Sequence, residues 1–454
     1  MPGVSAARKA AFDILLAVER GQSHSDDLLR GKAVNALSPA DRNLATALVL
    51  GVLRWQIRLD HQLRALLARP GARLDPEILI ALRLGAFQLQ LLDRVPAHAA
   101  IDESVELAKR AGHSFAARMV NAVLRKLGAM RFDVPEETPV QLALACAHPA
   151  WMIERWAGFY GIEAARAICR YGQSQPSSTM RVVSAAVEAE LASAGIRLER
   201  GELLSAARTV VSGDVASTPA FRDGRVRFQD EGSQLIGEIA ACTLLNLGRP
   251  ATNILDVCAA PGGKTLILAE RNPESHVVAC DASPRRLAQL RERFGACKDR
   301  IEFRLADAAA LEENSAFDVV LADVPCSGTG TLGRNPEIRH RLHPDDLPRQ
   351  AERQRAILRA ALRAVRSGGA VFYSTCSLEP EENIQVVSAA LAENPNARLI
   401  SLRSHIEALE SRGILTSGSA RRLSGCITPA GALGLLPGVF RADGFFVALI
   451  EKAE

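Results

Sequence analysis

The sequence predicts an α/β protein whose C-terminal half holds a mostly parallel sheet, preceded by an all-helical N-terminal region. From about residue 224 onward, short apolar runs alternate with helical segments, which is typical of a parallel sheet covered by helices. Over residues 5–134, apolar residues recur at helical spacing. We therefore expect a helical domain at 1–135, a small α+β module at 136–225 and an α/β domain at 226–454.

Composition restricts the class of protein. The chain is 48% hydrophobic and 23% charged, as in globular proteins, and no apolar run is long enough to span a membrane. The N-terminus lacks the apolar segment of a signal peptide, so we expect a cytoplasmic protein. We also expect it to be a monomer. The nine cysteines form no C-x-x-C pair, which favours free thiols over a metal site or disulfides.

The charge is unevenly distributed along the chain. Residues 1–134 carry a net charge of +6 and the remainder carries −2, which suggests a basic region that docks on a polyanion. Arg118, Arg125, Lys126 and Arg131 could form one exposed stripe that contacts phosphates. An ordinary solvated helix surface is the competing interpretation.

Helix signals recur through the N-terminal region. Ser38-Pro39 supplies an N-cap and a first-turn proline, Pro76 and Pro96 open later helices, and Gly112 and Gly128 can end helices. Pro135–Pro139 reads as a linker, and a further helical piece runs from His148 to Arg170. In the small module we expect strands near 180–183 and 209–211, with a helix at 185–194 between them.

The C-terminal half contains apolar runs of strand length. The expected strands are 254–257, 277–280, 301–305, 319–322, 370–373 and 445–450. Helices are expected at 264–271, 284–294 and 348–365. In such a sheet, ligands bind at the carboxyl ends of the strands.

The first of these strands leads into a small-residue turn and a helix. Small side chains from Cys258 to Gly263 would let a ligand approach the backbone, and the free N–H groups of the following helix suit polar or anionic groups. A phosphate-binding Walker loop would need glycine at Cys258, and G-x-G-x-x-G is absent. The turn therefore predicts a nucleotide-like ligand held by a different glycine turn; an ordinary strand-to-helix connection is the alternative.

Polar residues follow four consecutive strands. Asp281 ends the second strand, where a carboxylate can accept hydrogen bonds from ribose hydroxyls, and Asp307 follows the third, within reach of a base amine. Asp323 ends the fourth strand just before Cys326, and Cys376 ends the fifth. Each residue alone could be a cap or turn residue, but together they predict one crevice.

Two thiols in one crevice need a chemical reason. A thiolate is a soft nucleophile that positive charge activates, and Lys264 could supply that charge while Asn383 supplies a hydrogen bond. Such a nucleophile suits addition to C6 of a pyrimidine, which makes C5 able to accept a methyl group. A second group near the site would help to release the product.

At these residues the chain resembles the Sun (Fmu, RsmB) family of bacterial 16S rRNA cytosine-5 methyltransferases over nearly its whole length. The matching motifs are Cys258–Lys264, Asp323–Ser327 with Val324 where alanine is usual, Thr375–Ser377 with Pro380–Asn383, Asp443–Phe446, and Val226–Ser233. The resemblance implies a Rossmann-like methyltransferase domain with a seven-stranded sheet, an N-terminal NusB-like RNA-binding domain, and 16S rRNA as partner.

The resemblance also implies residue roles. Cys376 would attack C6 and Cys326 would assist release, although DNA cytosine methyltransferases by analogy favour Cys326 as nucleophile. Lys264 completes the expected catalytic set with Asp323, which would meet the cytosine. S-adenosylmethionine would be held by Cys258, Ala259, Ala260, Pro261, Gly262, Gly263, Lys264, Asp281 at the ribose, Asp307 at the adenine, and Asp323.

The target base must leave its stack, which favours a loop or unpaired nucleotide. The arginines at 334, 339, 341, 349 and 353 are expected to face the RNA backbone, with a solvated helix surface as the alternative. Two other functions remain open at this point: a tRNA cytosine-5 methyltransferase, or an RNA-binding assembly factor whose catalytic half is vestigial.

Overall fold

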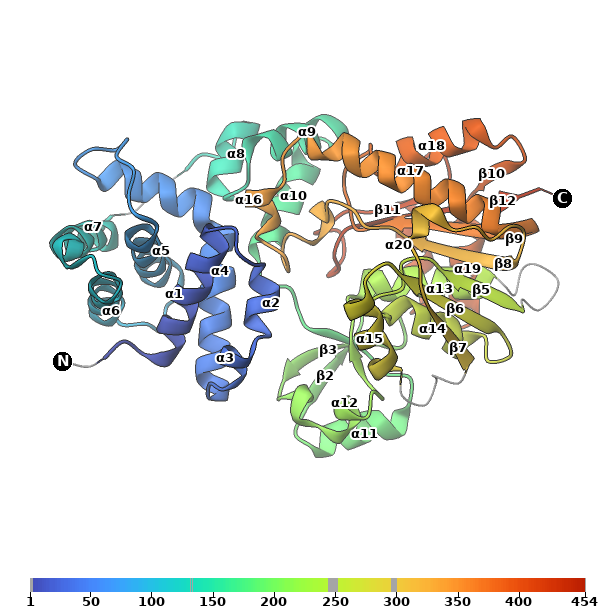
Figure 1. The fold of residues 1–454 in the computed structure, drawn as a ribbon, viewed down its shortest axis with the longest axis horizontal. Coiled ribbons are helices and arrows are strands. Elements are labelled where there is room, and N and C mark those ends of the chain that lie inside the picture. Colours follow the sequence, from blue (N-terminus) through green and yellow to red (C-terminus); the bar gives the residue numbers. More distant parts are fainter. Residues whose placement is uncertain (1–2, 131, 133, 244–251, 295–299, 454) are drawn as a thin grey trace. The chain divides into compact units, whose positions relative to one another are not determined.

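The computed structural model describes residues 3–130, 132, 134–243, 252–294 and 300–453, which fall into two compact units (Figure 1). The helical unit comprises Met1–Gln175 and Leu332–Arg341. The sheet unit comprises Pro176–Thr331 and Leu342–Glu454. These units and the three predicted domains divide the chain at different residues, so the three-domain division stays a prediction.

The N-terminal region is helical, as predicted. Its helices are α1 (Ala6–Glu19), α2 (Ser25–Leu29), α3 (Lys32–Asn35), α4 (Pro39–Leu66), α5 (Pro76–Leu91), α6 (Ala97–Arg110), the short 3₁₀ turn η1 (Ser114–Ala116), α7 (Ala117–Ala129), α8 (Pro139–Ala145), α9 (Ala150–Tyr160) and α10 (Ile162–Gln173). The hydroxyl of Ser38 accepts a hydrogen bond from the Asp41 amide, so the predicted N-cap of α4 is confirmed. Leu48, Leu59 and Leu63 recur on one face of α4 and are buried in the core of this unit.

Three local predictions for this unit need correction. The helical piece expected from His148 to Arg170 is two helices, because Gly161 adopts φ +84° between α9 and α10. Gly128 lies inside α7 instead of ending it. Helix α8 begins at Pro139, inside the segment predicted as a linker, because Thr138 and Gln141 form a reciprocal capping box there.

Residues Leu332–Arg341 belong to the helical unit although they lie between two elements of the sheet unit in the chain. The segment contains α16 (Ile338–Arg341). Arg339 is only 3% exposed and donates hydrogen bonds to the carbonyls of Arg54 (2.7 Å), Ala147 (3.3 Å) and Gly172 (2.6 Å). Burial, reinforced by Arg54, lowers the pKa of Arg339 to about 9. The expectation that Arg339 faces RNA is therefore wrong, because its side chain lies inside the helical unit and binds the backbone of three separate segments.

The small α+β module has the predicted type. Its antiparallel sheet has the order β2-β3-β1-β4, and its elements are β1 (Thr179–Arg181), α11 (Ala185–Ser193), β2 (Arg197–Arg200), β3 (Ala207–Ser212), η2 (Val215–Ser217), α12 (Pro219–Arg222) and β4 (Arg227–Phe228). Strands β2 and β4 were not predicted, because both are short edge strands rich in arginine.

The large sheet has the path β10-β12-β9-β8-β5-β6-β7, with β11 pairing on β12. The predicted mostly parallel sheet is confirmed, but within the described residues it has eight strands where seven were predicted, because β11 adds to β12. The strands are β5 (Asn253–Asp256), β6 (His276–Asp281), β7 (Ile301–Leu305), β8 (Phe317–Asp323), β9 (Val365–Thr375), β10 (Ala397–Ile400), β11 (Leu433–Leu435) and β12 (Phe445–Lys452). Strands β5 to β9 pair in parallel, whereas β12 lies antiparallel between β9 and β10. Strands β10 and β11 were not predicted.

Both faces of this sheet are buried. Ile254 and Val319 enter one apolar core, and their neighbours Leu255 and Val320 enter the other, as the two-residue period of a strand requires. The helices are α13 (Glu231–Thr243), α14 (Gly263–Arg271), α15 (Pro284–Arg293), α17 (Asp346–Ala364), α18 (Ile384–Glu393), α19 (Arg403–Ser411) and α20 (Ser419–Ser424), with the 3₁₀ turns η5 (Ala308–Ala310) and η6 (Thr329–Thr331). None of the helices described here is long and apolar enough to cross a membrane.

The turn from β5 to α14 is fixed by a buried carboxylate. Asp256 is 1% exposed; it accepts hydrogen bonds from the hydroxyl of Thr265 on α14 (2.7 Å) and from the Cys258 amide (3.3 Å). Burial raises the pKa of Asp256 to about 7, and the nearby Asp323 carboxylate adds to this rise. The residue thus pins the strand, the turn and the helix to one another.

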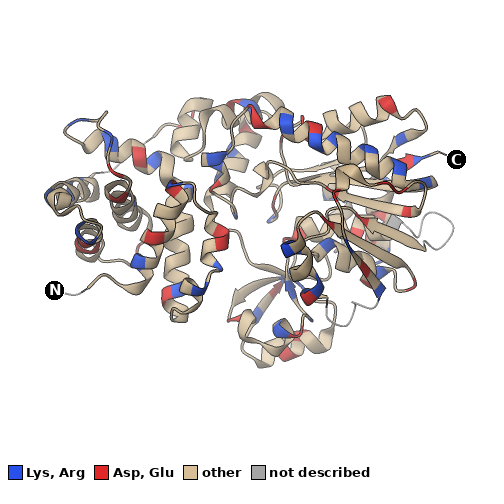
Figure 2. Ribbon diagram, in the orientation of Figure 1, with Lys and Arg blue, Asp and Glu red and all other residues tan. Residues whose placement is uncertain are grey.

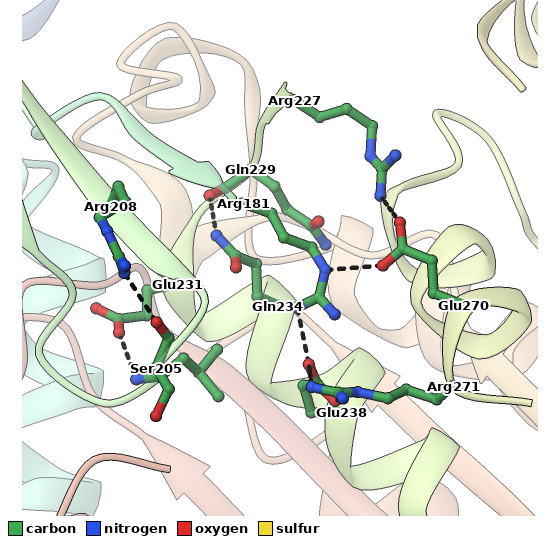
Figure 3. A network of polar contacts seen from close by, with 11 residues as sticks. Arg181, Ser205, Arg208, Arg227, Gln229, Glu231, Gln234, Glu238, Glu270 and Arg271 are labelled. Carbon is green, nitrogen blue, oxygen red and sulfur yellow. Dashed lines mark hydrogen bonds and ion pairs between the residues drawn. The ribbon is translucent and has the colours of Figure 1, made fainter. Parts of the chain in front are cut away.

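A network of ion pairs joins the small module to the helices of the large sheet (Figure 3). Arg181 of β1 pairs with Glu238 of α13 (2.7 Å) and Glu270 of α14 (3.0 Å); Arg271 also binds Glu238 (2.8 Å), and Arg227 of β4 binds Glu270 (2.7 Å). The side chains of Arg181 and Glu238 are 2% and 0% exposed, so each depends on its partners. The network explains why the module belongs to the sheet unit.

Removing one member of this network should destabilise the sheet unit. We expect Glu238→Ala to lower the free energy of unfolding by about 3–5 kcal/mol, because the buried Arg181 loses its closest counter-charge. The midpoint of urea denaturation measures this. The matched control is Glu190→Ala, which removes an exposed pair with Arg225 in the same module and should leave the midpoint unchanged. Equal denaturation midpoints for both variants would contradict the conclusion that the buried Arg181–Glu238 pair stabilises the sheet unit.

The raised pKa of Asp256 predicts a pH-dependent stability. The unfolded carboxyl titrates near 3.8 and the folded one near 7, so its contribution is fully present below pH 3.8 and is lost as pH rises to about 7. The difference amounts to about 4 kcal/mol. We expect Asp256→Asn, which cannot ionise, to raise the melting temperature at pH 8 relative to the unchanged protein and to raise it less at pH 5, where only about a third of the contribution has been lost. A variant that is equally destabilised at both pH values would refute this.

Candidate active site

The carboxyl ends of β6, β5, β8 and β9 meet at one edge of the sheet, because these neighbouring strands are parallel. Asp281 ends β6, Asp323 ends β8, and Cys376 directly follows β9. Strand β5 has β6 on one side and β8 on the other, so the chain order reverses there. This is the position at which open α/β sheets form a ligand crevice.

Asp323 connects the glycine turn to the cysteine strand. Its Oδ2 accepts a hydrogen bond from Nζ of Lys264 on α14 (2.7 Å), and its Oδ1 accepts one from the hydroxyl of Ser374 on β9 (2.7 Å). Burial opposes the charge on Lys264, but the Asp323 carboxylate outweighs it and raises the pKa of the ammonium. Lys264 therefore remains protonated between the turn and the thiols, with its Nζ 5.4 Å from the Phe445 ring.

The two cysteines predicted from the sequence lie together. The Sγ atoms of Cys326 and Cys376 are 3.4 Å apart, at hydrogen-bonding distance for sulfur. This hydrogen bond, together with burial, raises the pKa of Cys326 well above that of a free thiol. Cys326 therefore keeps its proton, and either sulfur can be the donor in this hydrogen bond.

Asn383 holds the backbone around Cys376. Its Oδ1 accepts from the Thr375 hydroxyl (2.5 Å), and its Nδ2 donates to the carbonyl of Ser377 (2.8 Å). The sequence suggested a hydrogen bond from Asn383 to a thiol, whereas the structure uses both ends of its amide on the residues before and after Cys376. Asn383 thus fixes the loop that carries the thiol.

Gly330 and Gly444 bring a third loop to this site. The Gly330 amide donates to the Cys376 carbonyl (2.9 Å), and the Gly444 amide donates to the Gly330 carbonyl (2.8 Å). A Cβ atom at Gly330 would lie 2.4 Å from the Gly444 oxygen, so no side chain fits there. This contact explains why the segment from Asp443 to Phe446 belongs to the same set of motifs.

The glycine turn presents backbone to the crevice. Ala259 and Ala260 are buried, Pro261 is exposed, and Gly262 adopts φ +104°, which favours glycine. Burial raises the pKa of Cys258, so this third nearby cysteine stays a neutral thiol. Gln229, which the sequence did not single out, has its side chain against Gly263, and its Oε1 is buried without a hydrogen-bond partner.

The two remaining predicted carboxylates differ in burial. Asp281 is 4% exposed; its Oδ1 accepts from the Ser283 amide (2.8 Å), and its Oδ2 lies 3.6 Å from Arg286. Asp307 is exposed, and its Oδ1 accepts from the Ala309 amide (3.1 Å) at the start of η5. Both side chains retain acceptor positions for a ligand.

Buried polar residues around the thiols were missed by the sequence analysis. Glu382, Gln354, Ser327 and Ser377 interact next to the two cysteines. Glu382 and Ser377 lie inside quoted motifs, but a pattern of residue types does not reveal which polar side chains are buried.

Cys146 and Cys169 also form a hydrogen-bonded pair, but both are buried in the helical unit. Cys146, Cys169, Cys242 and Cys280 are buried, and none of the cysteines in the described ranges forms a disulfide. Cys297 lies outside the described residues, as does Arg131 of the predicted basic stripe. Within the part of the chain that the structure describes, no cluster of three or more His, Cys, Asp or Glu residues could hold a metal ion.

Comparison with known families gives two matches. The model of the family described as "16S rRNA methyltransferase RsmB/F" matches residues 242–451, and that of the NusB family matches residues 5–129. "Probable ribosomal RNA small subunit methyltransferase B" of Bacillus subtilis is 33% identical over 99% of this chain and 99% of its own length. "Ribosomal RNA small subunit methyltransferase B" of Xanthomonas campestris is 33% identical over 99% of this chain and 98% of its own.

Solved structures share the fold. The crystal structure of PH0851 has a TM-score of 0.77 at 23% identity, covering 99% of this chain and 100% of that one. The structure titled "The crystal structure of NSun6 from Pyrococcus horikoshii with SFG" has a TM-score of 0.53 at 18% identity, covering 66% of this chain and 97% of that one. Family membership itself follows from the full-length relatives. The chain belongs to the RsmB/F family of 16S rRNA methyltransferases, which methylate RNA with S-adenosylmethionine as the methyl donor.

Proposed function

We propose that this protein methylates C5 of a specific cytosine in 16S rRNA through a covalent bond between Cys376 and C6 of the base. The observation that carries this proposal is the pair of sulfurs 3.4 Å apart beside the Asp323–Lys264 ion pair. Metal ligation or a structural disulfide would not need a neighbouring lysine. Soft nucleophilic attack on an electron-poor ring does benefit from one.

The residues of the crevice fit S-adenosylmethionine. The buried Gln229 oxygen that lacks a partner next to the glycine turn calls for a ligand donor, and the turn itself exposes backbone. In the proposed site, Asp281 accepts from the ribose hydroxyls, Asp307 accepts from the adenine amine, and the residues from Cys258 to Lys264 border the methionine end. Bound there, the cofactor supplies an electrophilic methyl group.

The two cysteines have different roles in the proposed reaction. Cys376, which lies near the Lys264 ammonium, forms a bond to C6 as a thiolate, and the ring electrons shift to make C5 nucleophilic. After C5 has accepted the methyl group and lost its proton to a base, the C5–C6 double bond re-forms and the C6–S bond breaks. The Cys326 thiol then stabilises the departing Cys376 thiolate by the hydrogen bond seen in the structure.

Asp323 is the proposed contact for the cytosine edge, because it borders both Lys264 and the strand that carries Cys376. The base reaches this site by leaving its stack, at a cost of a few kcal/mol that is smallest in a loop. Val324 is 4% exposed and packs into the core of the sheet unit, so it does not narrow the crevice.

The helical unit is the proposed docking surface for rRNA. Arg118, Arg125 and Lys126 of α7 are exposed, and positions 118 and 125 share a helix face. Figure 2 shows positive and negative positions interspersed along the helices of this unit, so contacts to phosphates would come from selected arginines. We propose that the enzyme acts as a monomer in the cytoplasm, where its rRNA substrate is assembled.

Substitution of each cysteine should give a different result. We expect Cys376→Ala to abolish methyl transfer, because it removes the sulfur proposed to attack C6, while binding of S-adenosylmethionine persists. Transfer of labelled methyl groups to rRNA and calorimetric binding of the cofactor measure the two effects. Full transfer activity in Cys376→Ala would reject its role as nucleophile.

Cys326→Ala should instead accumulate the covalent enzyme–RNA adduct, because the departing thiolate loses its hydrogen-bond donor. A band of protein linked to labelled RNA on a denaturing gel reports this. Cys280→Ala is the matched control, since this buried cysteine lies in the β6 core and should give neither effect. Normal turnover with no adduct in Cys326→Ala would refute its role in release.

Bisulfite mapping of RNA from cells with and without the gene identifies the substrate. We expect one cytosine of 16S rRNA to lose protection when the gene is absent. Loss of protection in tRNA alone would favour a tRNA methyltransferase. An unchanged pattern in all RNA would favour an assembly factor without catalysis.

A further inference from the structure

Glu382 is a buried carboxylate whose hydrogen-bond partners are all neutral. It lies between β9 and α18 and is 0% exposed. Its Oε1 accepts from the Ser327 amide (2.8 Å) and from Nε2 of Gln354 (2.9 Å), and its Oε2 accepts from the hydroxyls of Ser327 and Ser377. Placing an ionised carboxylate in the interior is costly unless such donors satisfy it.

The partners of Glu382 are the residues that follow the two cysteines. Ser327 comes directly after Cys326, and Ser377 comes directly after Cys376. The two serine hydroxyl oxygens are 3.1 Å apart, close to the 3.4 Å that separates the two sulfurs. One side chain therefore clamps two loops that are 50 residues apart in the chain. Since each thiol is one residue from a clamped serine, the clamp fixes where both sulfurs lie.

Gln354 extends the clamp to helix α17. Its Nε2 donates both to Glu382 and to the carbonyl of Pro325 (2.9 Å), the residue before Cys326. The loop that carries Cys326 is thus held on both sides of the cysteine. The Tyr373 hydroxyl donates to the Glu382 carbonyl (2.5 Å), which fixes the backbone of the clamp itself.

The negative charge of Glu382 also acts on the chemistry of the pair. Its carboxylate contributes to the raised pKa of Cys326, after the hydrogen bond with Cys376 and burial. A carboxylate at this place therefore favours the protonated form of Cys326. Cys376 is the sulfur that the proposed reaction assigns to attack on C6.

We propose that Glu382 is the positioning residue that sets the distance and the direction of the hydrogen bond between the two thiols. Its side-chain carboxylate binds Ser327, Ser377 and Gln354, and it acts on the thiols through the two serines. The expected effect of Glu382 on methyl transfer rests on the two-cysteine reaction proposed above. Its effect on the positions of the thiols rests on its hydrogen bonds to Ser327 and Ser377.

Two substitutions separate the effect of the charge of Glu382 from the effect of the length of its side chain. Glu382→Gln removes the charge and supplies an amide N–H₂ where two hydroxyls need an acceptor. Glu382→Asp keeps the charge but is one methylene shorter, so it does not span both serines. We expect both variants to lower kcat with rRNA from cells lacking the gene by about tenfold to a hundredfold, because misplacement by an ångström is costly. KM for S-adenosylmethionine should stay within about twofold of the original, because Glu382 does not contact the glycine turn.

A second readout does not require methyl transfer. We measure the pH dependence of iodoacetamide labelling of Cys326 by peptide mass spectrometry. In Glu382→Gln, the pH of half-maximal labelling should fall by about one unit, because a nearby negative charge is gone. In Glu382→Asp it should fall as well, because the shorter side chain no longer holds the hydrogen bond between the thiols, which is the first cause of the raised pKa of Cys326. Unaltered labelling in Glu382→Gln together with an unaltered kcat would overturn the proposal.

Controls separate this proposal from the function on which it rests. Glu393→Gln changes an exposed carboxylate on α18 that pairs with Arg355 and Arg359, and it should behave like the unchanged protein. If Glu382→Gln does not fold, as its melting curve would show, Ser377→Ala removes a single hydroxyl donor and should lower kcat several-fold at constant KM. An unaltered kcat in that variant would equally overturn the proposal. If the two cysteine substitutions fail their own tests, the labelling result still decides whether Glu382 positions the thiols.

Discussion

The site depends on the hydrogen bonds of one carboxylate, Asp323. It lies at the end of a central parallel strand, where it reaches α14 through Lys264 and β9 through Ser374. Lys264 comes from the glycine turn proposed to bind the cofactor, and Ser374 lies two residues before Cys376. Because this ion pair is largely shielded from water, it is stronger than an exposed pair would be. The glycine turn and the loop of the proposed nucleophile are thereby connected through one carboxylate.

The remainder of the site is held by carboxylates that face inward. Asp256 fixes the turn that opens α14, Glu238 joins the small module to the large sheet, and Glu382 holds the two cysteine loops. Each is almost completely shielded from solvent, and each is satisfied by several donors. Such groups contribute little net stability compared with apolar packing, but they are costly to leave unpaired. They therefore specify a single arrangement of loops that apolar contacts alone would allow to shift.

The two apolar cores on either face of the sheet supply the scaffold. Alternate residues of β5 and β8 enter opposite cores, so the sheet is held from both sides. This rigidity matters for the strand ends, since a thiol displaced by an ångström would no longer meet its partner. In the helical unit, Arg339 performs a related task, because its buried guanidinium ties three carbonyls from separate segments.

The sequence by itself determined the fold class, the glycine turn, the strand ends and the pair of cysteines, because these features depend on local periodicity and on residue types at short spacing. Strands β2, β4, β10 and β11 escaped prediction, since short strands are stabilised mainly by pairing with neighbours distant in the chain. Only the tertiary structure decided that Arg339 is internal, that Asn383 binds backbone, and that Glu382 joins Ser327 to Ser377. The physical reason is that contacts between residues far apart in the chain decide the burial and the hydrogen-bond partners of a polar side chain. The type of a residue and its neighbours in the sequence do not reveal those contacts.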